Sequence, residues 1–167
     1  CEDCNEYYDE DEMNTVGAYE DRRVCNNCLD NYRYAITRRG YNAYIYEGDC
    51  VYVESQDAYY DENYLSDNNI VELENGDYEH IDNAVEVDGD WYHSDDERLV
   101  YDDYNDRYDL IDNCEETEDN GWVNESNTWV CAESGKRYSE AIDPVEIDGE
   151  TYHPDYAPET TDETNEE

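Results

Sequence analysis

Apolar and polar residues alternate along short stretches of this chain, and turn residues separate the stretches. Residues 44–47 (Tyr-Ile-Tyr-Glu) and 51–54 (Val-Tyr-Val-Glu) have the period of two that is typical of β-strands. Dipeptides that favour hairpin turns recur between such runs, at Gly48-Asp49, Asn75-Gly76, Asp88-Gly89, Asn120-Gly121 and Asp148-Gly149. Helical periodicity is weak, and only residues 25–34 are predicted to form a short helix. The pattern predicts a mainly β protein with short helices, built from β-hairpins.

Two segments repeat each other. Residues 84–95 (AVEVDGDWYHSD) align with residues 144–155 (PVEIDGETYHPD), and each predicts a strand, an Asp-Gly turn and a second strand that ends at a histidine. A short turn-like stretch, which we call a knuckle, precedes each copy. Related knuckles begin near residues 1, 35, 72, 101 and 131, a period of roughly 30 to 37 residues. We therefore expect an elongated tandem array of five modules at 1–34, 35–71, 72–100, 101–130 and 131–157, followed by a disordered acidic tail at 158–167.

The strongest chemical motif is a pair of CxxC sequences. Cys1 and Cys4 form the first pair, Cys25 and Cys28 form the second, and 20 residues separate them. Four thiolates in this arrangement suit the tetrahedral coordination of Zn²⁺, and the intervening segment has room for a hairpin. A set of four protein ligands leaves no open coordination position, so the sequence predicts one structural zinc ion. Two disulfides or free thiols remain the alternatives.

The later knuckles keep only part of this ligand set. The module at 131–157 offers Cys131, Ser134, His153 and Tyr156, and the module at 72–100 offers Glu72, Asn75, His93 and Asp96. A structural histidine is the simpler interpretation of His93. Cys50 and Cys114 have no partner in a motif and are interpreted as small core residues.

At the knuckles the chain resembles the small tandem zinc-ribbon or treble-clef proteins of bacteriophages. The resemblance is full over residues 1–34 and partial beyond. It implies zinc at Cys1, Cys4, Cys25 and Cys28, and it implies modules of zinc-ribbon type along the chain. The last module, 131–157, also resembles a LIM-type half-site that has lost two ligands.

Charge changes the picture more than any motif. Fifty acidic residues face nine basic ones, for a formal net charge of −41. Twenty tyrosines and three tryptophans run through the same chain, whereas disordered acidic segments contain few aromatic residues. Duplex DNA carries one charge per ~1.7 Å, so this charge corresponds to roughly 20 base pairs or about 70 Å of duplex. An array of small folded modules would hold carboxylates at a similar density.

By this analogy of charge the chain resembles the DNA-mimic proteins that phages use against restriction, CRISPR and other DNA-binding machinery. The resemblance implies an inhibitor that occupies the basic DNA-binding groove of a host protein in the host cytoplasm. We expect no direct binding to nucleic acid and no binding to membranes, and a homodimer that extends the charged surface stays open. The carboxylates expected to bind the partner are Asp9, Glu10, Asp11, Glu12, Asp95, Asp96, Glu97, Asp102, Asp103, Asp106, Glu115, Glu116, Glu118 and Asp119.

Other functions fit the sequence less well. An adaptor could bind another protein through tyrosine-rich surfaces, with the charge serving solubility, and a halophilic protein would also be acidic and poor in lysine. The spacing of an EF-hand is missing, as are a phosphate-binding loop, an HExxH motif and a Ser/His/Asp order. We therefore expect no enzyme. A small basic cluster is expected to neutralise carboxylates within the fold; its members are Arg22, Arg23, Arg33, Arg38 and Arg39.

Overall fold

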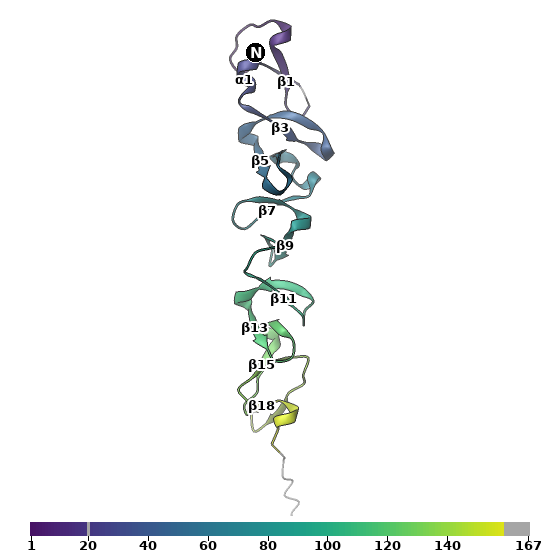
Figure 1. Cartoon of the computed structure of the whole chain (residues 1–167), viewed down its shortest axis with the longest axis vertical. Helices are drawn as coiled ribbons and strands as arrows, with labels where there is room; N and C mark the ends of the chain where they lie inside the picture. The colour runs from purple at the N-terminus through teal and green to yellow at the C-terminus, as the bar shows by residue number, and fades with distance from the viewer. Residues whose placement is uncertain (20, 159–167) are drawn as a thin grey trace, which may run out of the picture. The chain divides into compact units, whose positions relative to one another are not determined.

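The computed structural model describes residues 1–19 and 21–158, and the predicted tail at 158–167 lies outside them apart from Pro158. The chain forms two compact units, which we call unit 1 (Cys1–Ser94) and unit 2 (Asp95–Glu167). Both consist mainly of β-hairpins, as predicted, and short helical turns join them (Figure 1). The fold class read from the alternation pattern is thereby confirmed.

Each hairpin pairs two strands that are consecutive in the sequence. Those of unit 1 are β1 (Met13–Val16) with β2 (Arg22–Cys25), β3 (Tyr32–Ile36) with β4 (Asn42–Tyr46), β5 (Cys50–Val53) with β6 (Ala58–Asp61), β7 (Ile70–Glu72) with β8 (Tyr78–His80), and β9 (Ala84–Val87) with β10 (Asp90–His93). Those of unit 2 are β11 (Leu99–Asp102) with β12 (Arg107–Leu110), β13 (Cys114–Thr117) with β14 (Gly121–Asn124), β15 (Thr128–Val130) with β16 (Arg137–Ser139), and β17 (Val145–Ile147) with β18 (Glu150–Tyr152).

In unit 1, two hairpins join into one four-stranded sheet. Its order is β4-β3-β6-β5, because β3 pairs in parallel with β6 through Ala35 and Tyr59. Gly48 and Asp49 therefore do not form a hairpin turn, contrary to prediction. They belong to a 3₁₀ turn that carries the chain from β4 at one edge of this sheet to β5 at the other.

Short 3₁₀ turns follow many of the strands. They are η1 (Glu10–Glu12), η2 (Arg38–Gly40), η3 (Glu47–Asp49), η4 (Glu54–Gln56), η5 (Glu62–Tyr64), η6 (Ser66–Asn68), η7 (Ile81–Asn83), η8 (Ile111–Asn113), η9 (Glu125–Asn127) and η10 (Pro154–Tyr156). The only α-helix in the described residues is α1 (Asn26–Leu29). The helix predicted over residues 25–34 is therefore shorter than expected, because Tyr32 and Tyr34 pair with β4 instead.

The Asp-Gly turns have the conformation that their sequence requires. Asp88 and Gly89 have φ values of 54° and 98°, and Asp148 and Gly149 have values of 54° and 85°. Positive φ at both central residues defines the two-residue hairpin turn whose twist matches that of the strands. Aspartate tolerates this region better than most residues, and glycine has no steric cost there. The repeated segments 84–95 and 144–155 thus form the hairpins β9–β10 and β17–β18.

The interior is thin and differs between the units. Unit 1 contains three small apolar clusters, built around Val16 with Val24, Ala35 with Ile45, and Val53 with Ile70. The interior of unit 2 combines apolar Val123 with polar groups, and Asp102, Thr117 and Ser139 are buried there. In the part of the chain that the structure describes, every buried side-chain nitrogen and oxygen has a hydrogen-bond partner. Unit 2 is therefore held by a satisfied polar interior to a greater degree than unit 1.

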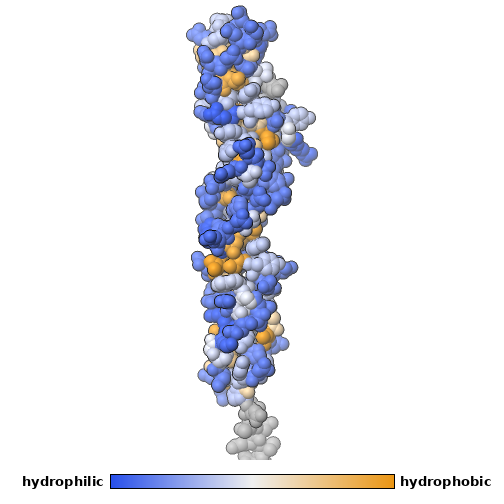
Figure 2. Space-filling model, in the orientation of Figure 1, coloured by the Kyte–Doolittle hydropathy of each residue, from blue (hydrophilic) through white to orange (hydrophobic). Residues whose placement is uncertain are grey.

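Carboxylates lie overwhelmingly at the surface. Among residues 1–19 and 21–158, the buried acidic side chains are Asp61, Glu79, Asp102 and Asp109. The space-filling view shows a face on which hydrophilic residues predominate, with small apolar patches between them (Figure 2). In the same residues, no helix has the length and apolar character needed to cross a membrane.

Candidate metal centre

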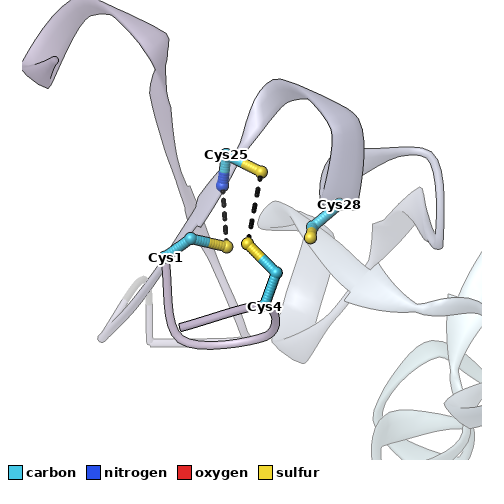
Figure 3. Close-up of side chains that lie close together, drawn as sticks. All are labelled: Cys1, Cys4, Cys25 and Cys28. Carbon is cyan, nitrogen blue, oxygen red and sulfur yellow. Dashed lines mark hydrogen bonds between the residues drawn. The ribbon is translucent and has the colours of Figure 1, made fainter. Parts of the chain in front are cut away.

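The four cysteines of the CxxC motifs come together at the start of unit 1. Cys1 and Cys4 lie in the turn that precedes the first hairpin, Cys25 is the last residue of β2, and Cys28 lies in α1. Their sulfur atoms are all within 4.8 Å of one another (Figure 3). The Sγ atoms of Cys4 and Cys25 are 4.0 Å apart, about twice the length of a disulfide bond. All seven cysteines of the chain are free thiols.

Backbone hydrogen bonds fix this geometry. The N–H of Glu2 donates to the carbonyl of Arg23 at 3.0 Å, which docks the first CxxC turn against β2. The N–H of Cys25 donates to Sγ of Cys1 at 3.2 Å, and the N–H of Asn5 closes the turn onto the carbonyl of Cys1 at 2.9 Å. Asn5 has φ of 59°, a left-handed conformation that Asn tolerates. The chain thus brings the cysteines together through its own hydrogen bonds.

The thiols are electrostatically coupled. Burial alone disfavours the Cys25 thiolate, but the N–H of Cys28 and donors from Tyr8, Cys28 and Cys4 lower its pKa to about 7. The hydrogen bond between the Cys28 thiol and Cys25 is the main cause that raises the pKa of Cys28 to about 12; burial and the repulsion between two negative sulfurs add to it. A divalent cation removes this conflict because it compensates several thiolates at once.

The arrangement is suited to a structural metal ion. Tetrahedral zinc with Zn–S bonds of ~2.3 Å places sulfurs roughly 3.8 Å apart, close to the 4.0 Å between Cys4 and Cys25. Four sulfur ligands would leave no position for a substrate or a water molecule. The predicted ligands Cys1, Cys4, Cys25 and Cys28 are therefore brought together, and they could hold a metal ion.

The same backbone pattern recurs at positions without four cysteines. The bond from Glu2 to Arg23 has counterparts from Glu74 to Trp91, from Glu118 to Arg137 and from Ala132 to Thr151, at 2.8 to 3.0 Å. Cys1 precedes the donor residue Glu2 by one position, and Cys25 follows the acceptor residue Arg23 by two. The same offsets at the other three bonds give the equivalent pairs Leu73 with His93, Thr117 with Ser139, and Cys131 with His153. Leu73 thus stands where the sequence predicts Glu72, so the first half of the predicted ligand set moves by one residue while His93 keeps its place.

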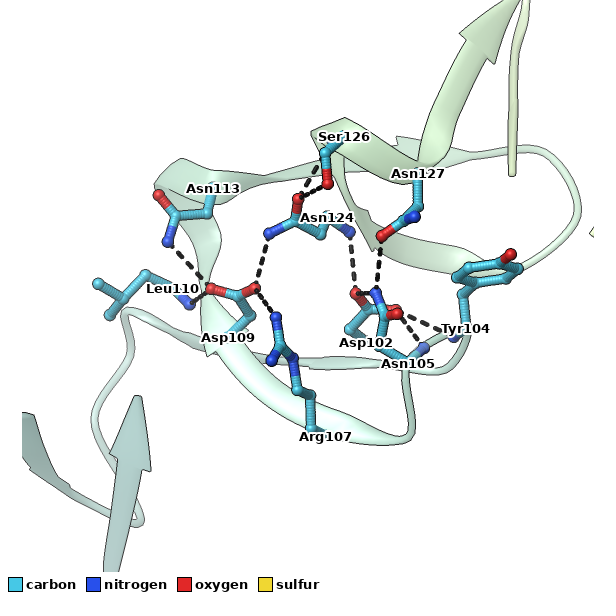
Figure 4. Close-up of polar contacts among 10 residues, drawn as sticks. All are labelled: Asp102, Tyr104, Asn105, Arg107, Asp109, Leu110, Asn113, Asn124, Ser126 and Asn127. Carbon is cyan, nitrogen blue, oxygen red and sulfur yellow. Dashed lines mark hydrogen bonds and ion pairs between the residues drawn. The ribbon is translucent and has the colours of Figure 1, made fainter. Parts of the chain in front are cut away.

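A further counterpart in unit 2 consists of Asp102, Asn105, Asn124 and Asn127, and we call it the polar tetrad (Figure 4). The N–H of Asn124 donates to Oδ2 of Asp102 at 2.9 Å, as the N–H of Cys25 donates to the sulfur of Cys1. Nδ2 of Asn105 then donates to Oδ2 of Asp102 at 2.6 Å and to Oδ1 of Asn127 at 3.1 Å. Hydrogen bonds therefore link the four residues of unit 2 that are equivalent to the four cysteines of unit 1.

The polar tetrad continues into a second buried carboxylate. Nδ2 of Asn124 donates to Asp109 at 2.8 Å, and Asp109 also accepts from the N–H of Leu110 and from Nδ2 of Asn113. Burial would raise the pKa of Asp102 and Asp109, but these donors outweigh it and lower both values. Asp102, Asp109 and Cys114 bring ligand atoms within 4.8 Å of one another. Because the carboxylates already accept up to four hydrogen bonds each, we interpret this group as a hydrogen-bonded interior.

The set around Cys131 keeps the backbone geometry and surrounds its histidine with aromatic rings. The N–H of His153 donates to Sγ of Cys131 at 3.4 Å, and Gly135 closes the turn as Asn5 does. The His153 ring lies 4.6 Å from that of Tyr138 and 5.6 Å from that of Tyr156. Burial raises the pKa of the Cys131 thiol, but donors from His153, Ser134 and Glu133 together lower it to about 7.

The carboxylates expected to bind a partner occupy different environments. Asp9, Glu10, Asp11, Glu12, Asp95, Glu97, Asp103, Asp106, Glu116, Glu118 and Asp119 are exposed, whereas Asp96 and Glu115 are half-buried. Several are engaged: Asp96 binds Arg98, Glu115 lies near Arg137, Glu118 pairs with Lys136 and Asp119 accepts from Ser139. The prediction that Asp102 binds a partner is wrong, because Asp102 is fully buried and both of its oxygens accept hydrogen bonds inside unit 2.

The basic cluster acts largely within the fold. Arg22 pairs with Asp3 at 2.8 Å, Arg33 pairs with Glu47 at 2.6 Å, and Arg23 lies 3.8 Å from Glu10. Arg38 uses a different contact, since its guanidinium lies 4.9 Å from the ring centre of Tyr19 and 5.6 Å from that of Tyr41. These distances are typical of cation–π packing.

Comparison with known proteins returned no matching family model, no matching curated protein and no matching solved structure.

Proposed function

We propose that the protein is a DNA mimic that occupies the basic DNA-binding groove of a host protein. The observation that carries this proposal is where the carboxylates lie. Nearly all of those described are on the surface, while the hairpins that bear them are fixed by cross-strand pairing and hydrogen-bonded turns. A disordered acidic chain would lose conformational entropy on binding, whereas preorganised carboxylates avoid most of that cost. The partner is a basic surface, and a defence system such as restriction or CRISPR is the class that the resemblance implies.

The metal centre has a supporting role in this proposal. The cysteine cluster would hold one zinc ion, which stabilises the first hairpin and its exposed Asp9–Glu12 segment. The protein would act without catalysis, in the cytoplasm of the cell whose DNA-binding protein it inhibits. Its complexes would form rapidly through electrostatic attraction and weaken as salt is added.

A pull-down from bacterial lysate tests the proposal directly. We expect the retained proteins to be DNA-binding proteins that duplex DNA displaces, with binding reduced at least about tenfold between 50 and 500 mM NaCl. Neutralising Glu97, Asp103 and Glu116 together, as E97Q, D103N and E116Q, should weaken binding. Retained partners that do not bind DNA, or capture that is insensitive to salt, would contradict the proposal.

A protein-interaction adaptor is the second candidate, and paired tyrosines favour it. Tyr34 with Tyr44, Tyr52 with Tyr59, and Tyr101 with Tyr108 face each other across strands, with ring centres 5.0 to 5.2 Å apart. All six side chains are exposed. If this candidate is correct, replacing Tyr101 and Tyr108 by serine abolishes partner binding, while the three charge-neutralising substitutions leave it intact.

A further inference from the structure

One cavity of unit 1 has the composition of a receptor for a cationic side chain. It has a volume of about 470 Å³, within the range of ligand-binding pockets. The rings of Tyr52 and Tyr78 line it, together with the carboxylates of Glu54, Asp77 and Glu79. His93 also lines the cavity, with its Nε2 3.9 Å from Oε2 of Glu79, and no lysine or arginine is among the lining residues. Three carboxylates against one histidine favour a positive group over an anion.

The walls of this cavity are fixed in place. Tyr52 donates its hydroxyl to Asp57 at 2.6 Å and packs against Tyr59 with ring centres 5.0 Å apart. Glu79 is 5% exposed and accepts from the hydroxyl of Ser55, the N–H of His80 and Nδ2 of Asn83. Burial would raise the pKa of Glu79, but these donors outweigh it and lower the value. A preorganised negative site of this kind loses little entropy when a ligand enters.

The arrangement favours a guanidinium over a metal ion. Among the described residues, the groups that bring three ligand atoms within 4.8 Å are the cysteine cluster and the group of Asp102, so the carboxylates of this cavity do not converge on one point. Dispersed carboxylates beside aromatic rings suit a planar cation that stacks on a ring and donates sideways. Arg38 shows this packing within the chain, between Tyr19 and Tyr41.

We propose that this cavity, between Tyr52, Glu54, Asp77 and Tyr78, receives an arginine side chain of the basic partner. The inference rests on the proposed function for the source of the arginine. It adds that the partner is recognised at a defined position as well as through its total charge. Arginine is preferred to lysine because the ammonium group can neither stack nor donate in a fork.

Titration with two short peptides tests the assignment: Gly-Arg-Gly-Arg-Gly and its lysine counterpart, capped at both ends. We expect the arginine peptide to shift the amide NMR signals of Tyr52, Leu73 and Tyr78 and to bind at least about fivefold more tightly than the lysine peptide. The double variant E54Q/D77N should weaken the arginine peptide at least about tenfold. Both side chains are exposed, and the backbone N–H of residue 77 keeps its bond to Asn75, so the fold should persist.

The matched control removes two charges outside the cavity, as D11N/E12Q in η1. Equal loss of affinity in the two double variants would overturn the proposal, as would equal binding of the two peptides. Circular dichroism on each variant confirms the fold before titration. This outcome can be told apart from that of the proposed function. If DNA does not displace the partner while the arginine peptide is still preferred, only the DNA-mimic proposal is refuted. If DNA displaces the partner while the two peptides bind equally, only the cavity assignment is refuted.

Discussion

Replacing Asp102 by asparagine should destabilise unit 2 strongly. The Asp102 carboxylate is fully buried and accepts four hydrogen bonds, from the N–H groups of Tyr104, Asn105 and Asn124 and from Nδ2 of Asn105. An asparagine has the same shape but only one acceptor oxygen. Each carboxylate oxygen of Asp102 accepts two of these bonds, so in either orientation the amide nitrogen of asparagine would face two donor groups.

The magnitude follows from the lost bonds. Hydrogen bonds to a charged group contribute about 1.5–3 kcal/mol each, so losing two of them lowers the free energy of unfolding by about 3 kcal/mol or more. For a unit of this size, about 3 kcal/mol corresponds to roughly 12–24 °C in melting temperature. Removing one negative charge from the acidic chain acts in the opposite direction, but the contribution of one charge is far smaller.

The matched control is Asp103→Asn, which removes the same charge from the neighbouring exposed position. Its effect should stay within about 0.5 kcal/mol. Urea unfolding followed by tryptophan fluorescence measures both variants in a Trp91→Tyr background, so that Trp122 and Trp129 report on unit 2. Equal urea midpoints for D102N and D103N would refute the interpretation of the polar tetrad as the interior that holds unit 2 together.

Three further predictions follow from the metal centre and the buried groups. Chelation of metal, or the substitution Cys25→Ser, should abolish zinc binding and the hydrogen-exchange protection of β1 and β2, while β11 to β14 keep their protection. The control Cys50→Ser should retain one zinc ion per chain. Loss of protection in β11 to β14 would contradict this prediction. The pKa values of four carboxyl groups are lowered in the folded protein, those of Glu79, Asp102, Asp109 and Asp119. They stabilise the fold above the ordinary carboxylate pKa range, and this stability is lost as pH falls through the folded pKa values, so the urea midpoint should decrease once the pH is below about 4. A urea midpoint that keeps increasing as the pH is lowered to about 3 would refute the prediction. Cys131 should resist iodoacetamide at pH 8 until urea unfolds the chain, because its pKa of about 7 is offset by full burial, and mass spectrometry of the labelled peptide tests this.

The sequence predicts the local units well because their signals are local. The Asp-Gly turns at Asp88 and Asp148 impose a backbone that fits only a tight hairpin, and alternation then assigns the flanking strands. The CxxC spacing likewise places four thiols near one another. The parallel pairing of β3 with β6 has no such signal, since it depends on how two hairpins pack. For that reason the prediction of a hairpin turn at Gly48 is wrong.

The polar tetrad shows why the site was only partly predictable. Cysteine is rare enough for its spacing to be noticed, whereas Asp102, Asn105, Asn124 and Asn127 are lost among many similar residues. The signal was nevertheless present, because 18 residues separate Asn105 from Asn124, and the same number separates Ser134 from His153. The high density of carboxylates made Asp102 resemble a surface residue. In the structure, its burial and the four donors that bind it distinguish Asp102 from exposed Asp103.

A polar interior at the positions where unit 1 has four cysteines has a physical logic in so acidic a chain. A buried carboxylate is costly unless donors surround it, and here backbone N–H groups and asparagine amides supply most of them. Arg107 adds one ion pair, with its Nη2 3.7 Å from Oδ2 of Asp109. Asparagine amides cannot lose a proton or release a metal, so unit 2 should keep its fold under conditions that strip metal from unit 1. At the surface of unit 2, Arg98 and Lys136 each bind an exposed or half-buried carboxylate. The chain can therefore present dense negative charge along hairpins whose stability requires little apolar burial and, in unit 2, rests on hydrogen bonds to buried carboxylates.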